Sequence, residues 1–414
     1  MLKTKLFSRI LRSLGVVGLF FSLNANLDLN LYKRYDVNFK PYRYEDKPFL
    51  YAFLFEHALD IHARNTNGDK VNILQLWNKD IDGLAMLRGF KEDTKIGKLA
   101  TELNVANDNG IRGHVVPCGD LKAFGASSYL RYNLPHDLFI SLFVPVYSMS
   151  LNKLSFKDET KNLSFLDDLT KKDLTSNFVK NVQDLSGIYL RPWKKTGFGD
   201  LMGTIEWDRN FIQEKPILKE VHLNGRLGVN IPTGLKHDED KLFAIPFGYQ
   251  FWGLYFGGGI DLLWWNCIKG GIDVEFLQLF SAARCLRIKT DKAQTDLLLL
   301  AKTRAIVEPG FISRYNLYLE AYKFNEIFTA RVAYQYYRKT KDRLWLFNND
   351  FSNEIANTSD ARRDSTLHQF LFIFGADFNR SCYDTHLSLF YKMPFNGKRS
   401  LQASTIGLNF YINF

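Results

Sequence analysis

The sequence predicts an all-β protein, a transmembrane antiparallel β-barrel of about twelve strands (ten to fourteen) that follows a cleaved signal peptide. Three observations favour this fold: long segments in which polar and apolar residues alternate, links that alternate between short and long, and an aromatic content of 15%. Transmembrane barrels need an apolar outer face and aromatic girdles at both interfaces, which would use these residues. Composition alone leaves a large soluble β-sandwich open as the alternative.

Alternation with a period of two is clear at residues 219–231, where Leu227 and Val229 share one face while Arg226 and Asn230 share the other. Twelve residues that rise roughly 3.3 Å each, tilted near 40°, cover about 30 Å and cross the apolar band of a membrane. Collecting such segments gives these expected strands: 50–63, 121–133, 137–149, 199–211, 219–231, 250–264, 268–286, 311–323, 326–340, 366–380, 383–394 and 403–414.

Link lengths give an independent test of this arrangement. Short or medium links fall at Pro135-His136, 212–218, Asn266-Cys267, 323–325 and Ser381-Cys382. Longer polar links fall between them, at 150–198, 232–249, 287–310, 341–365 and 395–402. Outer-membrane barrels have short periplasmic turns and long outer loops. Counting back from the C-terminus, the short links all lie on the periplasmic side, and so does the mature N-terminus.

The first 25 residues read as a signal peptide, because basic residues precede an apolar run from Leu14 to Leu23 and a small residue, Ala25, follows it. An amphipathic start to the first domain is the alternative. Export through the inner membrane and residence in the outer membrane follow from a signal peptide and a barrel together. Residues 26–414 then form a single barrel domain.

Two regions do not show the barrel pattern. Residues 64–120 contain a turn at Asn65–Gly68 and a helix-like stretch from Asp80 to Leu103, and Val71–Trp77 is a candidate extra strand. The loops near 150–198 and 341–365 are long, and 151–198 has the composition of short helices. Either 64–120 or 151–198 could fold inward as a plug or form a mobile surface loop.

Several classes of protein are disfavoured by composition. The net charge of +10 comes from Lys and Arg that are spread among acids without a basic block, so we expect no nucleic-acid partner. The sequence contains no run of about 18 consecutive apolar residues, which a membrane-spanning helix would need. The four cysteines are too scattered for a disulfide framework or a zinc site, and no phosphate-binding loop is present, so we expect no cofactor and no metal.

Charged residues fix which face of each strand points inward, because Arg or Lys facing hydrocarbon at the midplane costs about 2–4 kcal/mol. Both signs are present, which favours pairing across a narrow lumen and no sharp ion selectivity. The expected lumen-lining residues are Arg131, Asp200, Glu206, Asp208, His222, Asn224, Arg226, Asp273, Glu275, Arg314, Glu320, Arg331, Asp377, Asp384 and Lys392.

The last strand ends on an aromatic residue, and Phe410, Ile412 and Phe414 share its outward face. A terminal aromatic with this spacing is similar to the signal that outer-membrane barrel assembly machinery recognises. We therefore expect that machinery and the outer-membrane lipids as partners.

The stretch Gly197-Phe198-Gly199-Asp200-Leu201, followed by 225–234, which ends in Pro232-Thr233-Gly234, resembles the meta-pathway phenol-degradation type of outer-membrane channel. The resemblance covers about forty residues and implies a barrel that passes small or hydrophobic molecules, distantly similar in style to fatty-acid transporters. No counterpart of the fatty-acid transporters' N-terminal hatch sequence is present.

The leading expectation is thus a porin-like outer-membrane channel for small solutes, hydrophobic ones included. The alternative is a surface protein whose barrel only anchors outer loops for adhesion or interaction. An enzyme is the third class, and we expect none. His222-x-Asn224 faintly resembles a phospholipase motif, but Leu223 stands where the nucleophilic Ser belongs. The His and acidic residues of the 237–240 loop could form a protease-like catalytic site or a weak cation site. A hydrated charged loop is the simpler interpretation.

Overall fold

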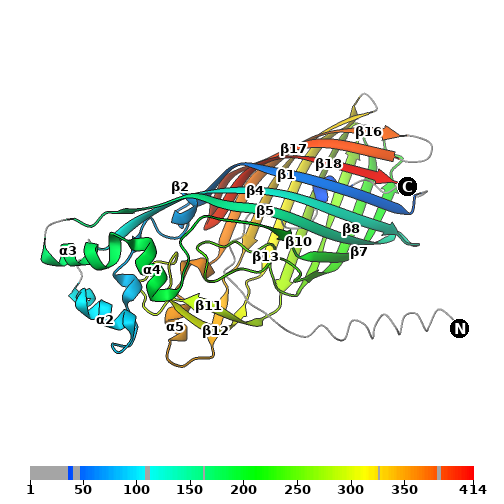
Figure 1. Ribbon diagram of the computed structural model, residues 1–414. Coiled ribbons are helices and arrows are strands. Elements are labelled where there is room, and N and C mark those ends of the chain that lie inside the picture. Colours follow the sequence, from blue (N-terminus) through cyan, green and yellow to red (C-terminus); the bar gives the residue numbers. More distant parts are fainter. Residues whose placement is uncertain (1–35, 41–46, 108–111, 162–163, 325–326, 380–383) are drawn as a thin grey trace.

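A closed antiparallel barrel forms the centre of the computed structural model, which describes residues 36–40, 47–107, 112–161, 164–324, 327–379 and 384–414 (Figure 1). Twelve strands pair around it in the order β1-β18-β17-β16-β14-β13-β10-β9-β8-β7-β5-β4, and β4 pairs with β1 to close the ring. Their bounds are β1 Phe49–Arg64, β4 His114–Asn133, β5 Leu138–Asp158, β7 Leu201–Ile212, β8 Leu218–Ile231, β9 Gly253–Trp264, β10 Ile268–Leu279, β13 Ile312–Phe324, β14 Phe328–Lys339, β16 Ser365–Asn379, β17 Asp384–Lys398 and β18 Ser400–Asn413. The predicted fold class and strand number are confirmed, whereas the predicted signal peptide lies outside the described residues.

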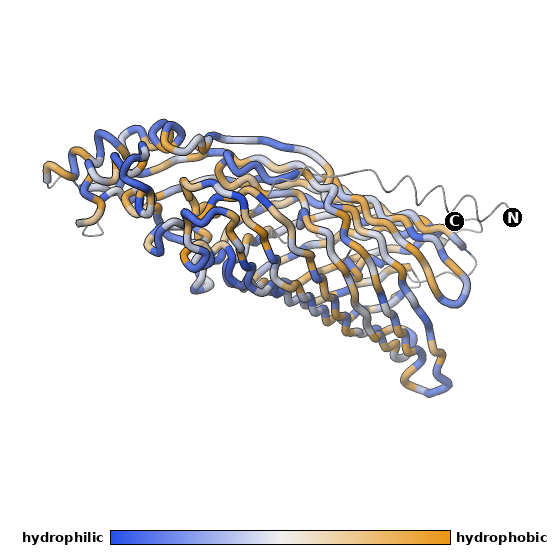
Figure 2. The backbone as a smooth tube through the Cα atoms, turned by 90° about the horizontal axis from the view of Figure 1, so that it is seen from below, coloured by the Kyte–Doolittle hydropathy of each residue, from blue (hydrophilic) through white to orange (hydrophobic). Residues whose placement is uncertain are grey.

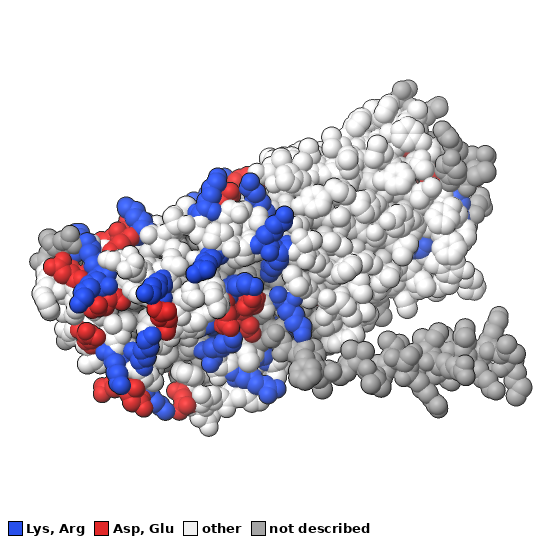
Figure 3. Space-filling model, viewed as in Figure 1, with Lys and Arg blue, Asp and Glu red and all other residues white. Residues whose placement is uncertain are grey.

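The two faces of the barrel wall are the reverse of those in a water-soluble protein. On β18, Leu408 is 49% exposed while its neighbour Asn409 is fully buried, and on β8 Leu227 is 53% exposed while Arg226 is 7% exposed. Apolar side chains therefore cover the outside and polar ones are enclosed, as a hydrocarbon surround requires. In Figure 3 the visible Lys, Arg, Asp and Glu gather over the half of the molecule that carries the helices, and most of the barrel surface shows neither sign. A closed barrel with this distribution is an outer-membrane architecture.

Tight turns explain the short links. His136 and Asp137 have φ of 63° and 62°, and Trp265 and Asn266 have φ of 47° and 60°. Two successive residues with positive φ make the hairpin turn whose twist matches that of the flanking strands. The short links that the structure describes, at 134–137, 213–217 and 265–267, lie at the end of the barrel where the C-terminus lies, as predicted (Figure 1).

Three predicted boundaries are wrong. The predicted strand 268–286 is two strands, because the chain leaves the barrel after Leu279 and β11 (Ala282–Ile288) joins a separate sheet with β12 (Ala301–Glu308) and β15 (Arg343–Leu346). The predicted loop 395–402 is a one-residue turn at Arg399, whose φ is 48°. Strands β4 and β5 also run beyond their predicted ends into the outer region. At 396–400 the residues form a polar run, Asn-Gly-Lys-Arg-Ser, which residue type alone does not distinguish from a loop.

The remaining long links fold together into a cap on the barrel. Its other elements are β2 Lys70–Val71, η2 Ile73–Gln75, β3 Ile81–Asp82, η3 Ala85–Leu87, α2 Lys95–Glu102, η4 Val105–Asn107, α3 Phe165–Thr170, η5 Lys171–Thr175, α4 Phe178–Ser186, β6 Trp193–Phe198, α5 Asn353–Ala356 and η6 Asp360–Arg362. No helix among the described residues is long and apolar enough to cross a membrane.

One apolar core holds the cap links to one another. Leu74, Leu174, Phe247 and Leu298 come from four different links and belong to the same buried cluster. The helices expected in 151–198 are present. Within Val71–Trp77 only Val71 lies in a strand, and Ile73–Gln75 form a 3₁₀ turn; only part of 80–103 is helical. Figure 2 shows hydrophilic and hydrophobic residues mixed along the cap, as in a folded layer with a wet exterior.

Candidate functional site: the barrel lumen

Residues 36–40, which we call the lumen segment, lie inside the barrel. Asp36 accepts a hydrogen bond of 3.0 Å from the backbone N–H of Asn38 and so caps the 3₁₀ turn η1 (Val37–Phe39). The ring of Phe39 lies 4.6 Å from that of Phe390 on β17, and Lys40 forms an ion pair with Glu206 on β7. Since β17 and β7 are on opposite sides of the ring, a segment that touches both crosses the lumen.

Polar contacts hold the lumen segment from several strands. The guanidinium of Arg314 lies 3.0 Å from the Asp36 carboxylate, and Gln335 donates a hydrogen bond of 2.9 Å to that carboxylate. The Asn38 amide donates to the side-chain oxygen of Asn316 at 2.9 Å. Asp36, Asn38 and Phe39 are each at most 5% exposed. The segment is therefore packed into the wall and not merely threaded past it.

Most of the candidate lumen residues fall into charged groups that pair with each other. Arg226 contacts Asp273 at 2.6 Å through one carboxylate oxygen and lies 3.5 Å from Glu275, which in turn lies 3.0 Å from Arg314. Further pairs are Arg331 with Glu320, Lys392 with Glu56, His222 with Asp208 and Asp261, His386 with Asp377, and Lys47 with Asp384. Asn224 accepts from Arg226 at 2.8 Å.

Two candidates lie apart from these groups. Arg131, 3% exposed, stacks over the Phe139 ring at 4.8 Å, and its Nε and Nη2 have no hydrogen-bond partner among the described residues. Asp200 stands at the rim between β6 and β7, where its carboxylate accepts backbone N–H groups from Gly234 at 3.0 Å and Gln250 at 2.8 Å. We interpret Asp200 as an anchor for the 232–252 link.

The motif behind the family resemblance is a set of contacts at this rim. The Thr233 hydroxyl donates to the carbonyl of Gly199 at 3.0 Å and accepts from the backbone N–H of Leu201 at 3.0 Å. A Cβ at Gly234 would lie 1.8 Å from the carbonyl oxygen of Phe247. Only glycine fits such a close backbone approach. The two halves of the motif therefore bind each other, and its role is structural.

The sequence pattern did not predict the lumen segment, and the expected plug was placed in the loops instead. The feature that could have indicated it is a stretch of about twenty residues, between the predicted signal peptide and the first strand, to which no structure was assigned. The run Gly257–Gly259 was missed as well. A Cβ at Gly259 would lie 2.8 Å from Asp273 Oδ2, so glycine there leaves room for the Arg226 group.

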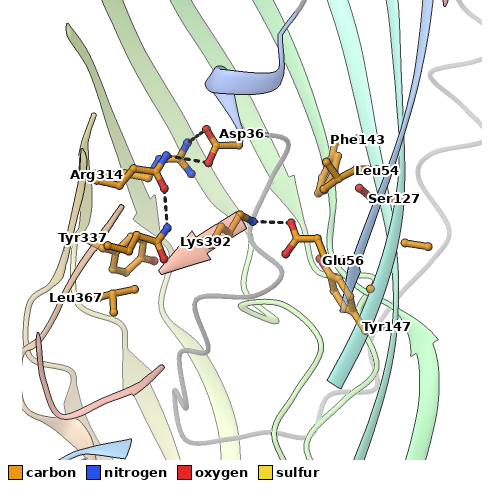
Figure 4. A pocket seen from close by; sticks show the side chains of 14 residues that line it. Asp36, Leu54, Glu56, Ser127, Phe143, Tyr147, Arg314, Tyr337, Leu367 and Lys392 are labelled. Carbon is orange, nitrogen blue, oxygen red and sulfur yellow. Dashed lines mark hydrogen bonds and ion pairs between the residues drawn. The ribbon is translucent and has the colours of Figure 1, made fainter. Parts of the chain in front are cut away.

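Cavities lie on both sides of the lumen segment. The outer cavity, about 700 Å³, is lined by Asp36, Glu56, Arg314, Lys392 and a set of apolar and aromatic residues that includes Leu54 and Phe143. In Figure 4, Glu56 of the Lys392–Glu56 pair lies on the side of Leu54 and Phe143, and Arg314 of the Arg314–Asp36 pair lies on the opposite side. Two inner cavities of about 610 and 410 Å³ are lined by Asn38 and Lys40 together with the charged groups nearer the short turns. Residues 36–40 thus stand between the outer and inner cavities.

The terminal strand presents the expected face. Phe410 is 39% exposed and Phe414 is 54% exposed, and the backbone N–H of Phe414 donates to the carbonyl of Phe49 at 3.0 Å. Phe414 therefore joins the last strand to the first at the seam of the barrel, and its role as an assembly signal remains a proposal.

The histidines considered for catalysis have other partners. His222 is held between Asp208 and Asp261. In the 237–240 loop, Asp238 pairs with Lys241 at 2.8 Å and Asp240 pairs with Arg287 at 2.7 Å and Lys302 at 2.9 Å. Within the described residues no group of three His, Cys, Asp or Glu side chains could hold a metal ion. That loop is a salt-bridged part of the cap.

We expect the cap to loosen in acid because of His237. Its Nδ1 contacts the Ala244 carbonyl, and burial, with Lys195 nearby, lowers the pKa of His237 to about 4. A histidine released from the cap titrates near 6.5 and takes up a proton that the folded cap refuses, so cap stability falls as the pH drops from about 6.5 to 4, by about 3 kcal/mol at most. Proteolysis of the cap at pH 7 and 4.5 measures this. The variant H237Q should remove most of the pH dependence, and an unchanged dependence would assign it to the carboxylates.

Comparisons with known proteins add the following. No protein-family model and no curated protein matches the chain. Among solved structures, an outer-membrane channel from Pseudomonas putida F1 is similar, with 10% identity over 91% of this chain and 98% of that chain and a TM-score of 0.48. The NanC porin has 9% identity over 72% of this chain and 98% of its own, with a TM-score of 0.30. A Pseudomonas aeruginosa FadL homologue has 10% identity over 89% of each chain, with a TM-score of 0.27. Similarities this distant identify no shared substrate.

Proposed function

We propose that the protein is an outer-membrane channel for small solutes whose path runs through the barrel lumen and is occluded by residues 36–40. The observation that carries the proposal is the position of this segment between the outer and inner cavities. The outer cavity and the two inner cavities are all lined by charged side chains, which a barrel that served only as an anchor would not need around an internal space. Charges of both signs favour small polar or amphipathic solutes over one type of ion.

The path has two levels along its length. The outer cavity combines the Glu56–Lys392 pair with Leu54, Phe143 and Tyr147, so a solute with an apolar part finds a surface there. The larger inner cavity is lined by Asp208, Asp261, Lys269 and other charged groups, so a hydrated path continues toward the short turns. Outside these cavities, ion-paired side chains occupy the lumen and limit its width.

An anchoring role is the second candidate, because the cap has an apolar core of its own and can present a stable outer surface. Among the described residues, neither His222 nor His237 has a Ser, Thr or Cys among its hydrogen-bond partners, so the acyl-transfer arrangement considered from the sequence is not supported. Conductance separates the channel from the anchor.

A cross-link tests the path directly. In a chain whose natural cysteines are replaced by Ser, N38C and N316C place two thiols where the amides now bond at 2.9 Å. The double variant lacks the hydrogen bond between the amides that holds the segment, so we expect it to show larger openings in planar bilayers than the unmodified chain. A short cleavable bis-thiol reagent should suppress these openings, and reductant should restore them. Each single-cysteine variant treated in the same way should be unaffected. Equal conductance before and after cleavage, or a folded barrel that stays silent in both states, would contradict the proposal.

A further inference from the structure

The cap contains a separate cavity of about 680 Å³, which we call the cap cavity. Five links contribute to its wall, through Trp77, Ile188, Phe243, Leu298 and Arg362. Ligand sites in proteins have mostly apolar walls and a few placed polar groups. The cap cavity has this composition, and no step of solute passage through the lumen uses it.

Its apolar wall is formed mainly by residues that belong to, or pack against, the apolar core of the cap. The run Leu297–Leu299 supplies three consecutive leucines from the 280–311 link. The rings of Trp77 and Phe243 meet at 6.1 Å on another side. A hydrocarbon body of a ligand would be enclosed by these groups.

Arg362 is the unusual group in the wall. It is 8% exposed, yet the described residues give its guanidinium no hydrogen bond and no ion pair, and its Nε is fully enclosed without a partner. The nearest carboxylates serve other groups, since Asp342 accepts from Lys339 at 2.8 Å and from the Gly310 N–H at 2.7 Å. Asp296, which also lines the cap cavity, accepts from the backbone N–H of Asp360 at 3.0 Å and lies 3.4 Å from Lys289, but its Oδ1 is enclosed without a hydrogen-bond partner among the described residues.

A buried charge without hydrogen bonds is unfavourable unless something neutralises it. A guanidinium also presents its donors in a fixed planar fork that matches a carboxylate. The other lysine and arginine on the cavity wall are already engaged, with Lys241 on Asp238 and Arg287 on Asp240. His237 is neutral at pH 7, because burial lowers its pKa to about 4. Arg362 is therefore the cation left for a ligand.

We propose that the cap cavity binds a small organic carboxylate with a compact apolar body, the carboxylate on Arg362 and the body against Leu297–Leu299 and Trp77. Glu239, whose Oε1 is also enclosed without a partner, stands in the same wall and disfavours a second anionic group on the ligand. The site thus selects a monoanion. This binding does not depend on whether the lumen conducts.

Isothermal titration of the full mature chain in nanodiscs tests the proposal with two probes of the same shape, cyclohexanecarboxylate and cyclohexanecarboxamide. We expect the carboxylate to bind at least about tenfold more tightly than the amide, as a charge-assisted pair on a buried guanidinium implies. Quenching of Trp77 fluorescence, absent in W77F, should follow the same curve. Equal affinities for the two probes, or no binding of either, would overturn the proposal.

Variants locate the site. R362M should lose the preference for the carboxylate while the barrel remains folded, because removing an unpaired buried charge removes a cost. R343M changes an exposed arginine of the same link and should bind both probes like the unmodified chain. If R362M disrupts the cap, R362K keeps the charge without the planar fork and should bind the carboxylate more weakly but still prefer it. A full preference retained in R362M would refute the assignment.

Discussion

Replacing residues 36–40 with Gly-Ser-Gly-Ser-Gly is expected to raise single-channel conductance several-fold in planar bilayers. The replacement keeps the chain length but removes the Asp36, Asn38 and Lys40 side chains, whose contacts hold the segment against β13, β14 and β7. A flexible stretch without these contacts leaves the lumen, because ordering it there costs about 1–2 kcal/mol per residue with nothing to offset it. The outer and inner cavities then join.

The matched control is the same five-residue replacement at 213–217, in the short link between β7 and β8, outside the lumen. Both variants should show the heat-dependent gel shift of a folded barrel, and only the first should conduct more. If the lumen-segment variant is folded but as silent as the parent, the cap closes the path, and an anchoring role becomes the better explanation of the fold.

The sequence predicts the barrel wall well because one physical rule governs it. Hydrocarbon outside and an enclosed polar interior impose a period of two on every strand, so the orientation of Arg226 against Leu227 can be deduced from the residue types alone. The same rule would have identified Glu56, Asn316 and Gln335 as inward residues. Tight turns such as His136-Asp137 then fix which strands are neighbours.

The occupant of the lumen could not be deduced in the same way. Asp36, Asn38 and Lys40 lie in a stretch that shows no periodic pattern. Their position in the lumen depends on partners roughly 170 to 300 positions away, which are Gln335, Asn316 and Glu206. The cap poses a similar difficulty. Its links are individually polar and read as loops, but together they bury one apolar core. The sequence therefore specifies a wall and leaves open what fills and covers it.

R226M is expected to destabilise the barrel by about 3–5 kcal/mol, the usual cost of removing one partner from a buried ion pair. Arg226 donates to Asp273, to Asn224 at 2.8 Å and to the Tyr255 hydroxyl at 3.1 Å, and its side chain is 2% exposed. Its loss leaves the Asp273 carboxylate enclosed without its cation. The midpoint of urea unfolding, followed by the heat-dependent gel shift, measures the change.

Arg209 provides the matched control on the neighbouring strand. Its side chain is 56% exposed and its nearest carboxylate, on Asp137, is 3.7 Å away, so R209M should change stability by about 0–1 kcal/mol. The contrast also tests whether the lumen is dry. Pairs screened by water would make both substitutions equally mild and both sensitive to salt, whereas an enclosed network makes R226M costly at any ionic strength. Equal midpoints for the two variants would therefore mean a water-filled passage beside the lumen segment, and a large difference would mean that the ion pairs themselves form the tightest part of the wall.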